Sequence, residues 1–218
     1  MTFIVAIQLN DSIIVAADNK EIVLQEDETI EFVERLASKI HPWHKGIITG
    51  TGESYVISRS IELFKQLAHS EIRKLPQCLE ISRQIRELEI GQEYYQVENT
   101  KLLCSSYSER GAQLYKIERF DSSLPYKLVA IEPMDITVWL FHPNIDNISG
   151  NLQKLYSDLK DRSAFSNQID WINYYIDRLA PIYQKQSRCD ALMSQSFDIF
   201  LQSKDTYISA HIPHAQSD

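Results

Sequence analysis

Thr2 carries a side chain that could act as a nucleophile once Met1 has been removed. A hydroxyl is a weak nucleophile and needs a base. The free α-amine of an N-terminal threonine, with a pKa of about 8, can take the proton of that hydroxyl. A small residue in the second position permits removal of the preceding methionine. The chemistry that this arrangement predicts is attack on an amide carbonyl.

Such an amidohydrolase also needs a charged pair and an oxyanion site. A lysine beside the hydroxyl lowers the pKa values of the amine and the hydroxyl, and a buried carboxylate holds the lysine in place. Asp18, at the end of a β-rich run, and Lys39, at the start of a later one, are the candidates. Gly50 and Gly52 precede a helical segment, where free N–H groups could stabilise an oxyanion.

The elements that must position these residues begin with a hairpin. Residues 3–9 and 12–17 are β-rich runs separated by an Asn-Asp pair that favours a tight turn. Because the two runs have similar length, the hairpin returns Asp18 to the side of Thr2. A second hairpin, from 38–41 to 46–52, starts near Lys39 and ends in a glycine-rich bend.

Periodicity predicts the remaining elements. Helices are expected at 53–70, 76–95, 149–161 and 166–186, and strands at 101–107, 112–119, 126–131, 197–202 and 207–212, with 135–141 either a strand or the start of a helix. The last helix is expected to bury one apolar face, made of Ile169, Ile172, Tyr175, Ile176, Leu179 and Ile182. The acidic stretch 25–35 is expected to form a surface excursion or a short helix.

Runs of strands alternate with pairs of helices in this order, which argues against a doubly wound parallel sheet. The pattern predicts an α+β fold: a four-layer αββα sandwich of two antiparallel sheets flanked by helix pairs. Without repeats, linkers or low-complexity segments, residues 1–212 are expected to form a single domain, and 213–218 a polar C-terminal tail.

The opening of the chain resembles that of proteasome β-type subunits and their bacterial relatives, which are Ntn hydrolases. Those proteins begin with threonine and carry a VAAD strand, followed by a small and a basic residue. Here Thr2-Phe-Ile-Val-Ala-Ile is followed by Ile13-Ile-Val-Ala-Ala-Asp18-Asn-Lys20, and Ser38-Lys39-Ile40 leads to Gly46-Ile-Ile-Thr-Gly50-Thr-Gly52. The likeness in sequence covers about residues 2–65, and the αββα order extends it to the whole chain.

The resemblance implies roles for these positions. Thr2 would be the nucleophile and its amine the base, Asp18 and Lys39 the charged pair, and Gly50 the source of the oxyanion N–H. Asp190 would correspond to an aspartate that precedes the penultimate strand, although Ser194 stands one place late and the family's glycines are missing there. The family's serine after its seventh strand is also missing from the stretch 129–133.

The amino-acid composition limits the classes of molecule that the chain is expected to bind. A formal net charge of −8 repels phosphate backbones, which disfavours nucleic acid and favours a basic partner. The sequence has no apolar run of membrane-spanning length and no signal-peptide pattern. Its three cysteines are far apart and lack metal-ligand spacing, as expected of free thiols in the cytoplasm. We expect no metal and no cofactor.

Two functions remain open at this point. In the first, the chain is an N-terminal threonine peptidase that forms an acyl-enzyme on a peptide or protein substrate. In the second, it is a catalytically inactive binding protein on the same scaffold, either a regulatory subunit or an immunity-type protein that engages a basic partner. The resemblance implies self-association as a homo-oligomer, and a monomer would favour the second function, because compartmental proteolysis needs a chamber.

Overall fold

The computed structural model describes residues 2–24, 30–91, 94–121, 123–140, 145–204 and 206–213, with only the backbone described at 21–24 and 30–36. Its internal contacts divide the chain into two compact units. The first unit comprises Met1–Lys39 and Pro133–Asp218, and the second comprises Ile40–Glu132. The polar tail expected at 213–218 lies, apart from Pro213, outside the described residues.

The first unit contains a five-stranded antiparallel sheet with the strand order β10-β1-β2-β11-β12. The strands are β1 (Ile4–Gln8), β2 (Ser12–Asp18), β10 (Asp135–Trp139), β11 (Phe197–Ser203) and β12 (Thr206–Ile212). The segment 135–141, for which the sequence allowed two interpretations, therefore contributes a strand. Every residue of β1 and β2 is buried, as expected for continuous apolar runs covered on both faces. The expected first hairpin is confirmed.

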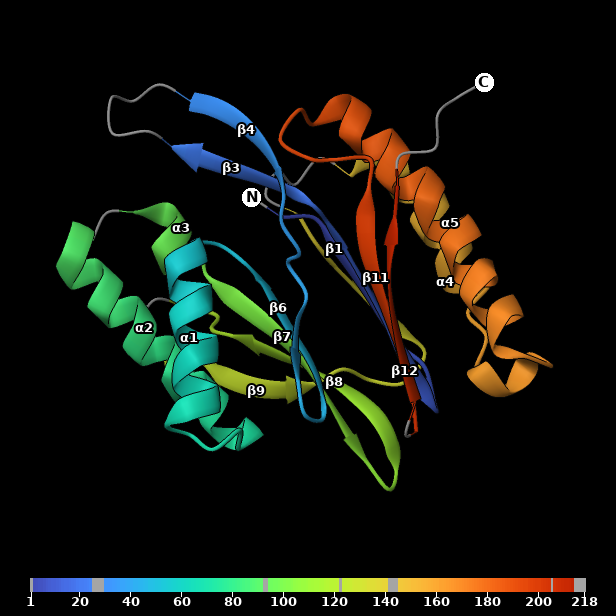
Figure 1. Cartoon of the computed structure of the whole chain (residues 1–218), viewed down its shortest axis with the longest axis horizontal. Helices are drawn as coiled ribbons and strands as arrows, with labels where there is room; N and C mark the ends of the chain where they lie inside the picture. Colours follow the sequence, from blue (N-terminus) through green and yellow to red (C-terminus); the bar gives the residue numbers. More distant parts are fainter. Residues whose placement is uncertain are drawn as a thin grey trace. The chain divides into compact units, whose positions relative to one another are not determined.

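Two helices, α4 (Asp146–Ser157) and α5 (Gln168–Cys189), lie along one face of this sheet (Figure 1). Phe3, which precedes β1, and Val5 within it share a core cluster with buried residues of α5 such as Trp171 and Leu179. The expected α5 face is partly wrong, because Ile169 is 68% exposed and Tyr183 is buried. The buried stripe follows Trp171, Tyr175, Leu179 and Ile182 at spacings of three and four residues.

The described part of the acidic stretch, residues 30–35, lies in a strand and not in a helix. β3 (Lys20–Leu24) and β4 (Ile30–Leu36) pair as a two-stranded antiparallel ribbon that continues from the end of β2. Residues 25–29 lie outside the described residues. Ile30, Phe32 and Val33, which stand among the acidic residues, favour an extended backbone and so explain the strand.

The second unit also contains a five-stranded antiparallel sheet, with the strand order β5-β6-β7-β8-β9. The strands are β5 (His41–Trp43), β6 (Gly46–Thr51), β7 (Lys101–Ser108), β8 (Gly111–Glu118) and β9 (Lys127–Ala130). The helices are α1 (Ser54–Gln66), α2 (Leu75–Ile90) and the short α3 (Tyr95–Glu98). Their shared core includes Val56, Phe64, Leu79, Leu102 and Ile117.

Two boundaries in this region differ from those expected. The strand expected to start at Ser38 begins at His41, so Lys39 lies in the segment that connects β4 to β5. Gly50 lies inside β6, paired with Leu102, and the bend itself falls at Gly52, whose φ of 118° suits glycine. Glu53 follows, and its carboxylate caps α1 by accepting a bond from Val56 N at 2.8 Å.

Each unit thus combines an antiparallel sheet with a pair of longer helices, which confirms the α+β class with its two sheets and two helix pairs. Among the helices of the described part of the chain, none has the length and apolarity to cross a membrane.

Candidate active site at the start of the first strand

Asp18, the last residue of β2, has a fully buried side chain that accepts four hydrogen bonds. Its Oδ1 accepts from Phe3 N at 2.7 Å and from Lys39 Nζ at 2.9 Å. Its Oδ2 accepts from Lys20 N at 3.2 Å and again from Lys39 Nζ, at 3.0 Å. A carboxylate offers about four acceptor positions, so this one is fully used.

Lys39 reaches Asp18 from the connection between β4 and β5. Its side chain is 14% exposed, so the ion pair is largely withdrawn from water. Burial of an unpaired carboxylate would be costly, and the ammonium together with two backbone N–H groups compensates for it. The connection is anchored to the same place, because Ala37 N donates to Asn19 O at 3.1 Å.

Thr2 is buried, with 8% of its surface exposed, and lies at the same end of the hairpin. Asp18 N donates to Phe3 O at 3.1 Å, and Leu9 N donates to Ser12 O at the other end. These bonds extend the β1–β2 register, in which Ile4 faces Ala17, so that Thr2 faces Asn19 across the hairpin. Asp18 and Lys39 therefore meet at the backbone N–H of Phe3, the residue that follows Thr2 in the chain.

An aromatic group supports this end of β1 from α5. The Tyr183 hydroxyl donates to Phe3 O at 3.4 Å, and its ring lies 4.7 Å from that of Phe3 and 4.4 Å from that of Phe197. Burial, and secondarily the charge of Asp18, hold the pKa of Tyr183 well above its usual range. The phenol therefore stays neutral and remains a hydrogen-bond donor.

Asp190, the fifth predicted site residue, organises its own turn. It follows α5, and its Oδ1 accepts from Leu192 N at 2.9 Å, as in an Asx turn. The loop that it starts does reach the hairpin, because Ser194 Oγ accepts from Asn19 N at 2.9 Å. Lys20 Nζ donates to Ala191 O at 2.7 Å.

Sequence reasoning missed Asn19, Tyr183 and the contact made by Ser194. Ser194 stands one residue later than the serine of the family's motif. The path of the loop nevertheless brings its hydroxyl to the hairpin, which a comparison of sequence positions does not reveal. Tyr183 could have been found, since it lies four residues after Leu179 on the buried stripe of α5. Asn19 gives no such signal, because an asparagine after a strand is typical of an ordinary turn.

Gly50 belongs to the second unit, where packing explains why it is a glycine. A Cβ atom there would lie 2.7 Å from both Leu102 Cδ2 and Lys101 O, on the neighbouring strand β7. No real Cβ contact is that short without a shift of the neighbours, so β6 and β7 require glycine at this position. Its oxyanion role stays a prediction.

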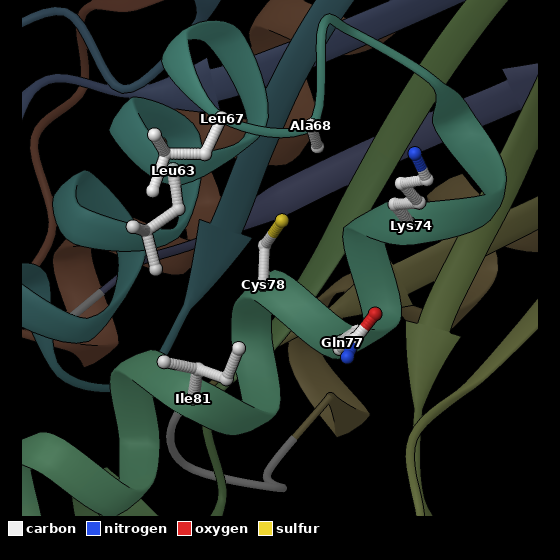
Figure 2. A pocket seen from close by; sticks show the side chains of 7 residues that line it. All are labelled: Leu63, Leu67, Ala68, Lys74, Gln77, Cys78 and Ile81. Carbon is white, nitrogen blue, oxygen red and sulfur yellow. The ribbon is translucent and has the colours of Figure 1, made fainter.

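A shallow hollow of about 180 Å³ lies between α1 and α2. Figure 2 shows its lining: Leu63, Leu67, Ala68, Lys74, Gln77, Cys78 and Ile81. Burial raises the pKa of Cys78, so this thiol stays protonated and is a poor nucleophile. Within the described ranges, no group of three or more His, Cys, Asp or Glu side chains is arranged to hold a metal ion.

No protein-family model matches the chain, and no curated protein matches it in sequence. Solved structures of Anbu match its fold. Anbu from Pseudomonas aeruginosa, solved as a helical assembly, aligns over 99% of this chain and 88% of its own, with a TM-score of 0.69 and 10% identity. A Gly-1 mutant of Anbu from Hyphomicrobium sp. strain MC1 aligns over 97% and 87%, with a TM-score of 0.66 and 12% identity.

A second Anbu structure from the Hyphomicrobium strain aligns over 96% of this chain and 87% of its own, with a TM-score of 0.63 and 12% identity. The coverage includes both units, so the likeness concerns the whole fold and not one hairpin. At such low sequence identities, a structural match establishes the fold and does not establish the catalytic activity. The chain therefore has the proteasome-like α+β sandwich fold of the Anbu proteins.

Proposed function

We propose that the chain is an N-terminal threonine amidohydrolase that acts on peptides. The observation that carries this proposal is the buried Asp18 carboxylate, which binds both the Phe3 N–H next to Thr2 and the Lys39 ammonium. A fixed positive charge at this place is what a threonine hydroxyl needs in order to lose its proton.

In the proposed reaction, Thr2 Oγ attacks the carbonyl carbon of a peptide bond while its proton passes to the α-amine. The C–N bond then breaks as the leaving amine takes that proton, which leaves an ester on Thr2. Water, with the α-amine again as base, hydrolyses the ester and restores the hydroxyl. Lys39 supplies positive charge beside the hydroxyl, and Asp18 holds Lys39 in position.

A threonine-directed electrophile tests this proposal on the natively produced protein. Intact-mass measurement should show loss of Met1 and one adduct, and Thr2→Ala should abolish both the adduct and peptide hydrolysis. A matched control is Thr206→Ala, in the exposed strand β12, which should react like the unmodified protein. Retained Met1 together with no adduct would overturn the proposal.

One observation favours the second candidate, a catalytically inactive binding protein. In the loop after α5, the two polar side chains that the resemblance assigns to the site are used within the loop or on the hairpin backbone: Ser194 Oγ bonds Asn19 N and Ser196 O, and Asp190 bonds Leu192 N. With the acidic net charge of −8, such a protein would attract a basic partner. Hydrolysis that depends on Thr2 would eliminate this candidate.

We also propose that the chain self-associates through the outer face of α1 and α2. Leu67, which lines the apolar hollow of Figure 2, is 71% exposed, and Leu88, further along α2, is 87% exposed. The Anbu protein of Pseudomonas aeruginosa, which has the same fold, forms a helical assembly. Light scattering should show an oligomer that Leu67→Asp with Leu88→Asp dissociates, whereas Ile169→Asp on α5, equally exposed, leaves it intact. A monomeric unmodified protein would contradict the proposal.

A further inference from the structure

Asn19 is a buried side chain with an unused hydrogen-bond acceptor beside Thr2. The residue is 2% exposed, and its backbone is fully engaged: its N–H reaches Ser194 Oγ, and its C=O accepts from Ala37 N. Its side-chain Oδ1 is buried and has no hydrogen-bond partner among the described residues. A buried acceptor without a donor destabilises the folded state, so this oxygen calls for an explanation.

The register places this acceptor across from Thr2. Phe3 and Asp18 form a hydrogen-bonded position of the β1–β2 ladder, since Asp18 N donates to Phe3 O. The next pair, Thr2 and Asn19, is therefore a non-hydrogen-bonded position. At such positions of an antiparallel pair the side chains lie on one face, with Cβ atoms about 4.5–5.5 Å apart. In the mature chain Thr2 is the terminal residue, so rotation about its Cα–C bond can turn the α-amine toward β2, where an asparagine oxygen can reach it over that separation.

Removal of Met1 would create a charged donor at this buried place. The α-ammonium of Thr2 has three N–H groups, each of which needs an acceptor. Asp18 cannot take them, because Phe3 N, Lys20 N and two contacts from Lys39 already use its acceptor positions. The amide oxygen of Asn19 is an acceptor that remains.

We propose that Asn19 is a positioning residue whose Oδ1 accepts a hydrogen bond from the α-ammonium of mature Thr2. This proposal rests on the threonine-hydrolase function, for which the amine is the base. A bond from the charged amine is stronger than one from the neutral amine, so Asn19 raises the pKa of the amine. The other charged or titratable groups around this site are Asp18 on β2, Lys20 on β3, Lys39 before β5, and Tyr183 on α5.

The test measures the pKa of the Thr2 amine directly. The chain is released to begin at Thr2 by cleavage of an N-terminal fusion, labelled with ¹³C-threonine, and followed by NMR as a function of pH. Asn19→Leu, which keeps the volume but removes the acceptor, should lower the pKa by about half a unit to one unit. Asn19→Asp should raise it, because a carboxylate binds an ammonium more strongly than an amide does.

Asn10→Leu is the matched control, at the opposite end of the same hairpin, where Asn10 Nδ2 bonds Asp161 at 2.9 Å; it should shift nothing. A pKa in Asn19→Leu within about 0.2 unit of the unmodified chain would overturn the proposal. If that variant does not fold, an unraised pKa in Asn19→Asp overturns it instead. The titration needs no catalysis, so a shifted amine that fails to react with a threonine-directed electrophile would refute the hydrolase while the Asn19 contact stands.

Discussion

Two aspartates lie in two regions of the first unit, and they differ in burial and in the residues that they bind. Asp18, at the end of the β1–β2 hairpin, is fully buried and holds residues from three segments of the chain. Asp190, in the loop after α5, is half-buried and bonds the N–H of Leu192, two residues away. The resemblance to proteasome subunits implied a role for both, through a matching strand for Asp18 and through an incomplete motif for Asp190.

The difference between the two aspartates shows how a residue that organises a candidate site can be distinguished from one that only shapes a nearby loop. A buried carboxylate with an ammonium and two N–H donors is organised in advance, because its partners are held by the sheet and cannot relax around a lost charge. A turn aspartate stabilises a local loop shape and leaves the sheet untouched. Substitutions of Asp18 and of Asp190 should therefore change the stability of the protein and the reactivity of Thr2 by very different amounts.

The largest effect is expected from Asp18→Ala. It leaves the Lys39 ammonium and two backbone N–H groups without their acceptor in a buried place. Such a loss typically costs about 3–5 kcal/mol of unfolding free energy. Urea unfolding followed by circular dichroism measures it, with Asp198→Ala on β11 as a control for loss of an acidic residue from the same sheet. A cost no larger than that of the control would break the comparison.

Lys39→Met should be the next most damaging. It leaves the Asp18 charge with only Phe3 N and Lys20 N as donors, and we expect a loss of about 2–3 kcal/mol, since water can partly replace a side chain that is slightly exposed. Combined with Asp18→Ala it completes a double-mutant cycle, whose coupling should be about 1–3 kcal/mol. Additive costs would mean that the ion pair does not act as a unit.

Tyr183→Phe should have a smaller effect that depends on pH. At neutral pH it removes a long bond to Phe3 O, a loss of about 0.5–1 kcal/mol. The folded-state pKa of Tyr183 is raised above the usual value of about 10, so its contribution is complete below that pH and is lost as pH rises toward the folded pKa. The Phe variant should therefore lose less stability on alkalinisation, and parallel stability–pH curves would contradict this.

Asp190→Ala should have the smallest effect. It removes the bond to Leu192 N in a partly exposed turn, at a cost below about 1 kcal/mol. The rate at which Thr2 reacts with an electrophile should stay within a factor of about 2, which is well under 1 kcal/mol in activation free energy. A drop as deep as that in Asp18→Ala would place Asp190 in the machinery of Thr2 and remove the contrast between the two regions.

The hairpins, helices and both sheets could be predicted because their residues repeat with the period of the element. The contact between Asp18 and the start of the chain followed from two strands of similar length. The ribbon of β3 and β4 could not be predicted from an acidic composition that is equally typical of a solvated surface. Nor could the contact between Ser194 and Asn19, because it depends on the route of a loop through space. The oxyanion role of Gly50 stays a prediction, because packing against Leu102 by itself explains a glycine at that position.

The burial of Thr2 bears on the order of events in the making of the protein. An aminopeptidase that removes Met1 must take the next residue into its own binding cleft, and it cannot do so while Thr2 is covered within the folded sheet. For the proposed threonine hydrolase, cleavage is therefore expected while the chain is still emerging from the ribosome, before β1 pairs with β2 and β10. A hydrolase of this kind that folded with Met1 attached would keep it, so the yield of mature protein would depend on the relative rates of processing and folding.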